Sequence, residues 1–258
     1  MKFIILLVLN TIIPLYVSAK TIIYVGSATD VNPPFTNSLV PNSNTKGIIS
    51  DLVTELNKLQ SNLYFEQVKT SARRRCLEFK NKTVDLIFLA SMNWGWKKCQ
   101  GKNLVDIAMY KEVYITKSKP NINQTFFNDL KHKNFVIMRG FHYGFANFNS
   151  DENYLKSNFH VEFSSSYEAM LKMILNERGD VGVVPYSYIK YYSSFDHSIK
   201  NNFFISNKID SSDVLSIIGK EHSTKFNNDS IIKLFKILKE KGTIIKLFKK
   251  YKLEELLL

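Results

Sequence analysis

The residue types that most often carry chemistry are sparse in this chain and lack the spacing of a reactive site. No two of the five histidines lie four residues apart, the spacing with which one helix presents two metal ligands. These histidines are His132, His142, His160, His197 and His222. The sequence contains no G-x-S-x-G, no H-E-x-x-H and no glycine-rich phosphate loop. We therefore expect no metal, no cofactor and no catalytic residue, although two carboxylates brought together by folding leave no local sequence pattern.

The positive charge of the chain is large but diffuse. Lys and Arg number 35 against 23 Asp and Glu, a net charge of +12, and 45% of the residues are apolar. Such a composition excludes a disordered tail. The one dense basic cluster, Arg73-Arg74-Arg75, is short, and zinc-finger, basic-zipper and RNA-recognition patterns are absent. We therefore predict no nucleic-acid partner and interpret the charge as a solvated basic surface, which would also attract anionic ligands or an anionic membrane.

The first nineteen residues have the pattern of a secretory signal peptide. Met1-Lys2 is a short positive start, apolar stretches follow at 3–9 and 12–17, and Val17-Ser18-Ala19 supplies small residues before a cleavage site. The apolar stretch is interrupted and shorter than the ~20 residues of a membrane span, although an uncleaved anchor is the alternative. We predict cleavage after Ala19 and a soluble periplasmic protein that begins at Lys20.

Export places the two cysteines in an oxidising compartment. Cys76 and Cys99 allow a single bridge, which would close a loop of about 24 residues and contribute ~3 kcal/mol by the chain-entropy model. Two free, buried thiols are the alternative. We predict the disulfide, and this argues against a cysteine nucleophile.

Strand and helix patterns alternate along the chain. Strands are predicted at 21–26, 63–69, 84–90, 112–116, 135–139, 160–163, 180–185 and 214–218, and helices at 47–56, 72–81, 126–130, 152–157, 167–176, 228–239 and 243–250. Such alternation indicates an α/β fold with mainly parallel sheets. This number of short strands in a chain of this length favours two small sheets over one large sheet.

Several segments follow one another in a characteristic order. They are a first strand followed by Pro33-Pro34-Phe35, G-I-I-S-D-L at 47–52, T-V-D-L-I at 83–87, Leu130-Lys131 before a strand that ends in Arg139-Gly140, R-G-D-V-G-V-V at 178–184, and a helix-Gly-helix ending at 238–251. This order resembles the periplasmic solute-binding proteins of ABC importers, specifically the polar amino-acid-binding family. The ending is the most specific of these matches.

The resemblance implies a type II periplasmic-binding-protein fold with two α/β lobes, each a mainly parallel sheet flanked by helices. Lobe 1 would comprise 20–115 and 214–258, lobe 2 would comprise 116–213, and the two crossing strands would lie near 114–117 and 207–214. A small-molecule ligand would be caught between the lobes as they close. The partner would be the membrane permease of an ABC importer, and the protein itself would be a monomer.

The resemblance also implies ligand-binding residues in lobe 1. Phe35 stands where the family places an aromatic cover, although packing on its own lobe is the alternative. Ser91 and Asn93 form the family's polar turn, with Trp94 and Trp96 beside it as stacking surfaces or ordinary loop contacts. The family's carboxylate-binding arginine falls at Lys97, twelve residues beyond Asp85. Lysine lacks the two-pronged geometry of arginine, so selectivity for a carboxylate should fall.

In lobe 2, the resemblance implies an anion-binding turn and an ammonium-binding position. The turn at 139–144 contains Arg139, His142 and Tyr143, and its backbone N–H groups could hold an oxyanion. The family's ammonium-binding aspartate falls at Ser187, beside Tyr186, so the expected carboxylate is missing. Because burying an unpaired ammonium is costly, we expect a ligand other than a standard α-amino acid, such as an anionic or aromatic small molecule.

Two other functions remain open at this point. A dehydratase-like enzyme on the same fold would need an acid–base pair in the cleft, for which His142, Asp85 and Glu112 are the candidates. A ligand-sensing module for a membrane receptor would share every binding feature with a transport protein. Ligand binding without catalysis is the function that we expect.

Overall fold

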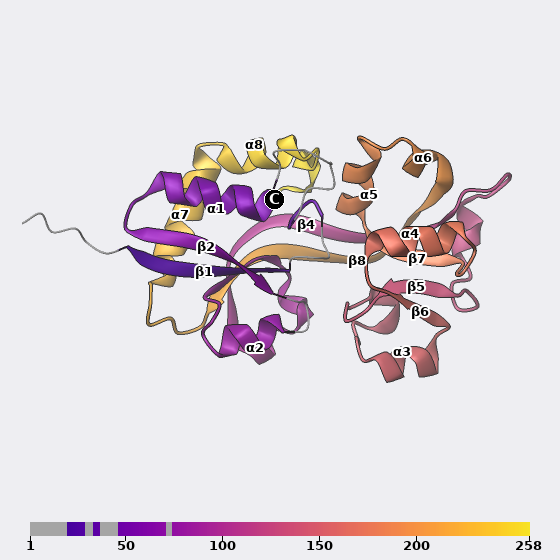
Figure 1. Ribbon diagram of the computed structural model, residues 1–258, viewed down its shortest axis with the longest axis horizontal. Coiled ribbons are helices and arrows are strands. Elements are labelled where there is room, and N and C mark those ends of the chain that lie inside the picture. The colour runs from indigo at the N-terminus through magenta and orange to yellow at the C-terminus, as the bar shows by residue number, and fades with distance from the viewer. Residues whose placement is uncertain (1–19, 29–32, 37–45, 71–73) are drawn as a thin grey trace, which may run out of the picture.

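Two long antiparallel strands connect the two halves of the protein. The computed structural model describes residues 20–28, 33–36, 46–70 and 74–258, so the predicted signal segment at 1–19 lies outside the described residues. Strands β4 (Gly101–Lys117) and β8 (Phe203–Lys220) pair from Gly101 opposite Lys220 to Lys117 opposite Phe203. The other elements gather in one lobe at each end of this pair (Figure 1).

Lobe 1 is built on three strands beside one end of β8. Strand β1 (Thr21–Ala28) lies parallel to both β2 (Leu63–Thr70) and β3 (Leu86–Ala90), and β3 pairs antiparallel with β8. Its helices are α1 (Ile48–Leu59), α2 (Arg75–Lys80), α7 (Asn228–Glu240) and α8 (Thr243–Lys250), with short 3₁₀ helices η1 (Met92–Trp94), η2 (Trp96–Cys99) and η5 (Glu254–Leu256).

Lobe 2 is built in the same way beside the other end of β4. Strand β7 (Val181–Pro185) pairs antiparallel with β4, and β5 (Phe135–Met138) lies parallel to both β7 and β6 (Val161–Ser164). Its helices are α3 (Glu152–Asn158), α4 (Tyr167–Leu175), α5 (Tyr186–Ser193) and α6 (Ser198–Asn202), with 3₁₀ helices η3 (Gln124–Phe127) and η4 (Gly144–Ala146). The region predicted as a helix at 126–130 is thus a 3₁₀ turn that ends at Phe127.

Hydrogen bonds join the eight strands of the described residues into one sheet, in the order β2-β1-β3-β8-β4-β7-β5-β6. The expectation of two separate small sheets is therefore wrong, because the strands predicted at 112–116 and 214–218 are parts of two much longer strands shared by both lobes. Glu112 already pairs with Pro185 of β7, so β4 enters lobe 2 before the predicted crossing at 114–117. The pairing with β8 shifts register between Glu112 and Ile115.

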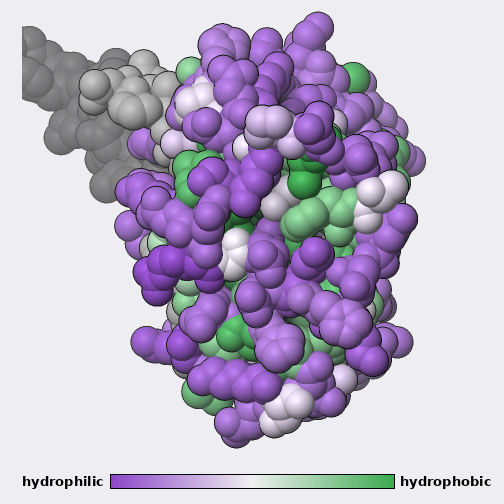
Figure 2. Space-filling model, turned by 90° about the vertical axis from the view of Figure 1, so that its right-hand side faces the viewer, coloured by the Kyte–Doolittle hydropathy of each residue, from purple (hydrophilic) through white to green (hydrophobic). Residues whose placement is uncertain are grey.

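Each lobe packs apolar side chains on both faces of its sheet. In β3, Leu86 and Phe88 join the cluster beneath α1, α7 and α8, whereas Ile87 and Ala90 join the cluster beneath α2. All five residues of β3 and of β7 are buried, as expected for strands covered on both faces. The outer end of lobe 2 is mostly hydrophilic, with small apolar areas between polar side chains (Figure 2). None of the helices among the described residues has the length and apolarity needed to span a membrane.

Candidate functional site

A cleft lies where the two lobes meet at β4. Its walls come from lobe 1 and from the turn after β5 in lobe 2, and it encloses about 850 Å³ of empty space, some of it continuous with solvent. Six aromatic side chains line it: Phe35, Phe88, Trp94, Trp96, Tyr110 and Phe141.

Arg75 is the positive charge of this cleft. It is the first residue of α2, and its guanidinium carbon lies 5.8 Å from the centre of the Trp96 ring. No ion pair joins it to a carboxylate of the described chain, and its Nε atom is buried without a hydrogen-bond partner. Burial lowers the pKa of Arg75 to about 10, so the side chain remains charged at neutral pH.

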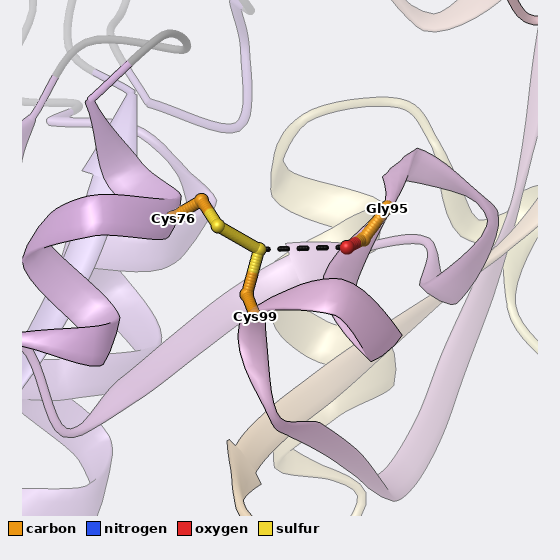
Figure 3. The surroundings of a disulfide bond; sticks show 3 residues. All are labelled: Cys76, Gly95 and Cys99. Atoms are coloured by element: carbon orange, nitrogen blue, oxygen red, sulfur yellow. Dashed lines mark hydrogen bonds between the residues drawn. A yellow bond between two sulfur atoms is a disulfide. The ribbon is translucent and has the colours of Figure 1, made fainter.

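A disulfide holds Arg75 against Trp96. Cys76 follows Arg75 directly and is bonded to Cys99 at the end of η2, with 5.5 Å between the two Cα atoms (Figure 3). Cys99 Sγ also lies 3.4 Å from the carbonyl oxygen of Gly95, beside Trp96. The bond therefore fixes α2 to the turn that carries the indole ring.

Two further buried polar atoms of the cleft have no hydrogen-bond partner in the part of the chain that the structure describes. They are Trp96 Nε1 and Thr36 Oγ1, and both residues line the cleft together with Arg75. The nitrogens of Trp96 and Arg75 can only donate hydrogen bonds. Because unpaired buried donors are unfavourable, acceptor oxygens placed in the cleft would find hydrogen-bond donors there.

Glu112 brings a carboxyl group to the floor of the cleft. Its side chain is 2% exposed; Oε1 accepts a hydrogen bond from Tyr110 Oη at 3.2 Å, and Oε2 accepts one from Ser211 Oγ at 3.0 Å. Burial, and next the nearby charge of Asp210, raise the pKa of Glu112 to about 8. At neutral pH the carboxyl group is therefore mostly protonated and neutral.

The polar turn predicted to bind a ligand in lobe 1 is bound to the protein itself. Asp213 on β8 accepts hydrogen bonds from Ser91 Oγ at 2.9 Å, Asn93 Nδ2 at 2.7 Å and Trp94 Nε1 at 3.2 Å. Ser91 and Asn93 do not line the cleft, whereas the Trp94 ring does. The donors of this turn are therefore already used.

The turn after β5 binds an anion, as its pattern suggested, but the anion is Asp210 of β8. The Asp210 carboxylate accepts hydrogen bonds from the backbone N–H groups of Gly144 at 2.7 Å and Phe145 at 2.9 Å, and from Tyr114 Oη at 2.6 Å. A Cβ atom on residue 144 would lie 2.1 Å from the Asp210 carbonyl oxygen, so glycine is required there. These backbone donors are not free for a ligand.

The predicted basic residues lie away from the cleft. Lys97 is exposed on η2 and does not line it. Arg139 is half exposed and pairs with Glu152 at 2.5 Å. Among the described residues, Arg75 lines the cleft and Lys97 does not. The sequence feature that could have pointed to Arg75 is its position next to Cys76. The disulfide between Cys76 and Cys99 brings Arg75 close to Trp96.

The remaining predicted residues divide between cleft and core. Phe35 and His142 line the cleft, and burial and then the charge of Arg75 lower the pKa of His142. Tyr143 is fully buried, and its hydroxyl group binds the backbone of Met138. Tyr186 and Ser187 begin α5 and do not line the cleft.

Of the three candidate acid–base residues, Glu112 and His142 share the cleft and Asp85 does not. Asp85 instead pairs with Lys225 at 2.7 Å and accepts a hydrogen bond from the backbone N–H of Tyr24. The described residues contain no cluster of three or more potential metal ligands.

Comparison with known proteins identifies the fold. No protein-family model matches the sequence, and no curated protein matches it either. A mutant of ArgBP from T. maritima superposes with a TM-score of 0.67 at 18% identity, over 90% of this chain and 95% of that chain. The GluR0 ligand-binding core from Nostoc punctiforme, in complex with L-glutamate, superposes with a TM-score of 0.65 at 17% identity. The superposition covers 90% of this chain and 98% of that chain.

A third similar structure is the ancestral amino-acid-binding protein AncCDT-1, described as a precursor of cyclohexadienyl dehydratase. Its TM-score is 0.63 at 15% identity, over 90% of this chain and 95% of that chain. At such low sequence identity, the similarity shows that the proteins share a fold. It extends over nearly the whole length of each protein. The chain therefore has the two-lobed α/β fold of the type II periplasmic binding proteins.

Proposed function

We propose that this protein is an extracytoplasmic solute-binding protein. It captures a small polar or anionic molecule between its lobes, as a monomer, and delivers it to the membrane permease of an ABC importer. The observation that carries the proposal concerns Arg75. Its guanidinium lines the cleft, and its buried Nε atom has no hydrogen-bond partner among the described residues. A similar structure is the substrate-binding protein of an amino acid ABC transporter, at 19% identity and a TM-score of 0.63.

The positions of the lining residues suggest how binding would close the lobes. Arg75 and Trp96 belong to lobe 1, whereas Phe141 and His142 belong to lobe 2. A ligand that contacts both sets lowers the free energy of the closed form more than that of the open form. The bend would occur in β4 and β8, where their pairing changes register near Glu112.

Titration calorimetry with a panel of amino acids, carboxylic acids and sugars tests the proposal, with X-ray scattering to measure the radius of gyration. We expect one class of solute to bind and to reduce the radius of gyration. Arg75→Gln should weaken that binding about ten- to hundredfold, the loss of a charged hydrogen bond. Lys97→Gln is the matched control, because Lys97 is exposed and outside the cleft. Loss of binding in the Lys97 variant, and not in the Arg75 variant, would contradict the assignment.

A dehydratase-like enzyme is the second candidate, favoured by one observation. Glu112 is a carboxyl group whose pKa is raised to about 8, and it shares the cleft with His142. Such a group can donate a proton near neutral pH. Conversion of a bound carboxylic acid, detected by mass spectrometry and lost in Glu112→Gln, would establish catalysis; recovery of unchanged ligand supports binding alone. Co-purification with a permease or with a receptor then separates transport from sensing.

A further inference from the structure

The charges and hydrogen bonds of the cleft specify what kind of anion it can hold. We infer that the ligand is a carboxylic acid with a flat aromatic body and no ammonium group, its carboxylate bound by Arg75 and Trp96. This inference rests on the proposed function and narrows it to one class of solute. It excludes the free α-amino acids that the neighbouring structures bind.

The unpaired polar atoms of the cleft call for acceptors on the ligand. Arg75 Nε and Trp96 Nε1 are donors without a partner among the residues that the structure describes, and Thr36 Oγ1 can also donate. A carboxylate presents two oxygens with several lone pairs to such donors. Because the disulfide fixes Arg75 beside Trp96, both donors are positioned before the ligand arrives.

At neutral pH, the described lining of the cleft offers no charged counterpart for an ammonium group. Asp213 already accepts hydrogen bonds from three side-chain donors, and Asp210 accepts them from two backbone N–H groups and a tyrosine hydroxyl. Glu112, the carboxyl group that does line the cleft, already accepts two hydrogen bonds. Among the described residues of the lining, Arg75 is the one permanent charge, so the cleft is positive overall. A zwitterion would place its ammonium group in this positive field with no partner.

The walls fit a flat apolar body. Trp94 and Tyr110 meet edge to face with ring centres 5.2 Å apart, and Trp96 meets Phe79 in the same way at 5.7 Å. Rings held in this manner present fixed faces and edges to a third ring. Aromatic faces also attract cations, but Arg75 already lies over Trp96, and its charge repels a second cation.

The pH dependence of binding distinguishes an anion from a zwitterion. Glu112 faces Tyr110 and Tyr114 on its own strand, Asp210, Ser211 and Asp213 on β8, and Tyr143 and Tyr167 of lobe 2. Ionisation of Glu112 above pH 8 adds a negative charge to the cleft, which repels a carboxylate and attracts an ammonium group. Affinity for the proposed ligand should therefore fall as the pH rises from 7 to 9, and affinity for a cation should rise.

Matched compounds that differ only in their charged groups test the inference. The set is 3-phenylpropanoate, L-phenylalanine and 2-phenylethylamine, with indole-3-propanoate, L-tryptophan and tryptamine as a larger series. We expect calorimetry at pH 6.5 to show one or both acids binding at least tenfold more tightly than the matching amino acid, and the amines not binding. Arg75→Gln should weaken acid binding about ten- to hundredfold. Glu112→Gln should flatten the decline of acid affinity above pH 8, and Lys97→Gln should leave both the affinity and its pH dependence unchanged.

The possible failures separate the two proposals. Tight binding of an amino acid with lobe closure overturns this inference and leaves the solute-binding function intact. Binding of an aliphatic acid or a sugar instead overturns the inference that the ligand is aromatic. The proposed solute-binding function would still stand. If no solute of the wider panel binds or reduces the radius of gyration, both proposals are refuted.

Discussion

The buried carboxyl group of Glu112 should make the stability of the protein fall as the pH rises. Replacing it by Glu112→Gln removes the ionisation and keeps the size of the side chain. The pKa of Glu112 is raised in the folded protein from the ordinary 4.5 to about 8. Between these two values the unfolded chain has lost the proton that the folded protein keeps, so proton release favours unfolding.

The size of this effect follows from the width of the pH window. Each pH unit lowers the free energy of unfolding by about 1.4 kcal/mol, which amounts to about 5 kcal/mol between pH 4.5 and 8. For a chain of this size that is a change in Tm of roughly 10–20 °C. The contribution is fully present below pH 4.5 and is lost as the pH rises through 8. The glutamine variant lacks this decline.

Thermal unfolding followed by circular dichroism from pH 4.5 to 9 measures the difference between the two proteins. We expect the Tm of the Glu112→Gln variant to rise relative to that of the wild type as the pH increases. Glu162→Gln, on the exposed surface of β6, is the control and should follow the wild type. Parallel Tm curves for the wild type and the Glu112 variant would refute the reasoning, because every other titrating group is common to both.

Two further changes test the supports of the site. Replacing both Cys76 and Cys99 by serine should cost ~3 kcal/mol and lower the Tm by roughly 6–12 °C in calorimetry, because the bond closes a loop with a sequence separation of 23; an unchanged Tm would contradict this. Gly144→Ala should cost about 1–3 kcal/mol in denaturant unfolding, because the new methyl group meets the Asp210 carbonyl oxygen; unchanged stability would show that the turn can relax.

Local sequence patterns were sufficient to predict much of the fold. The apolar runs of β3 and β7 are buried on both faces, and the predicted helix boundary at Gly242 separates α7 from α8, where the backbone has a positive φ of 67°. The long strands β4 and β8 were predicted only in part. Much of their first halves is polar and exposed, so only the buried segments had a recognisable pattern.

The site was harder to predict because it depends on contacts between distant residues. Counting from Asp85 led to Lys97, but two successive 3₁₀ helices with Gly95 at a φ of 85° between them bury Trp96 and leave Lys97 exposed. The partner of Asn93 lies 120 residues away, at Asp213. No local pattern reports such pairings.

The carboxylate that fills the turn after β5 has a consequence for how the protein could change its specificity. Asp210 is covalently part of the same chain, so it competes for the N–H groups of Gly144 and Phe145 at an effective concentration on the order of millimolar or higher. A dilute solute cannot displace this built-in competitor. In the proposed function, selection among anions would therefore depend on Arg75, and new specificities would evolve by altering its neighbours and not the turn.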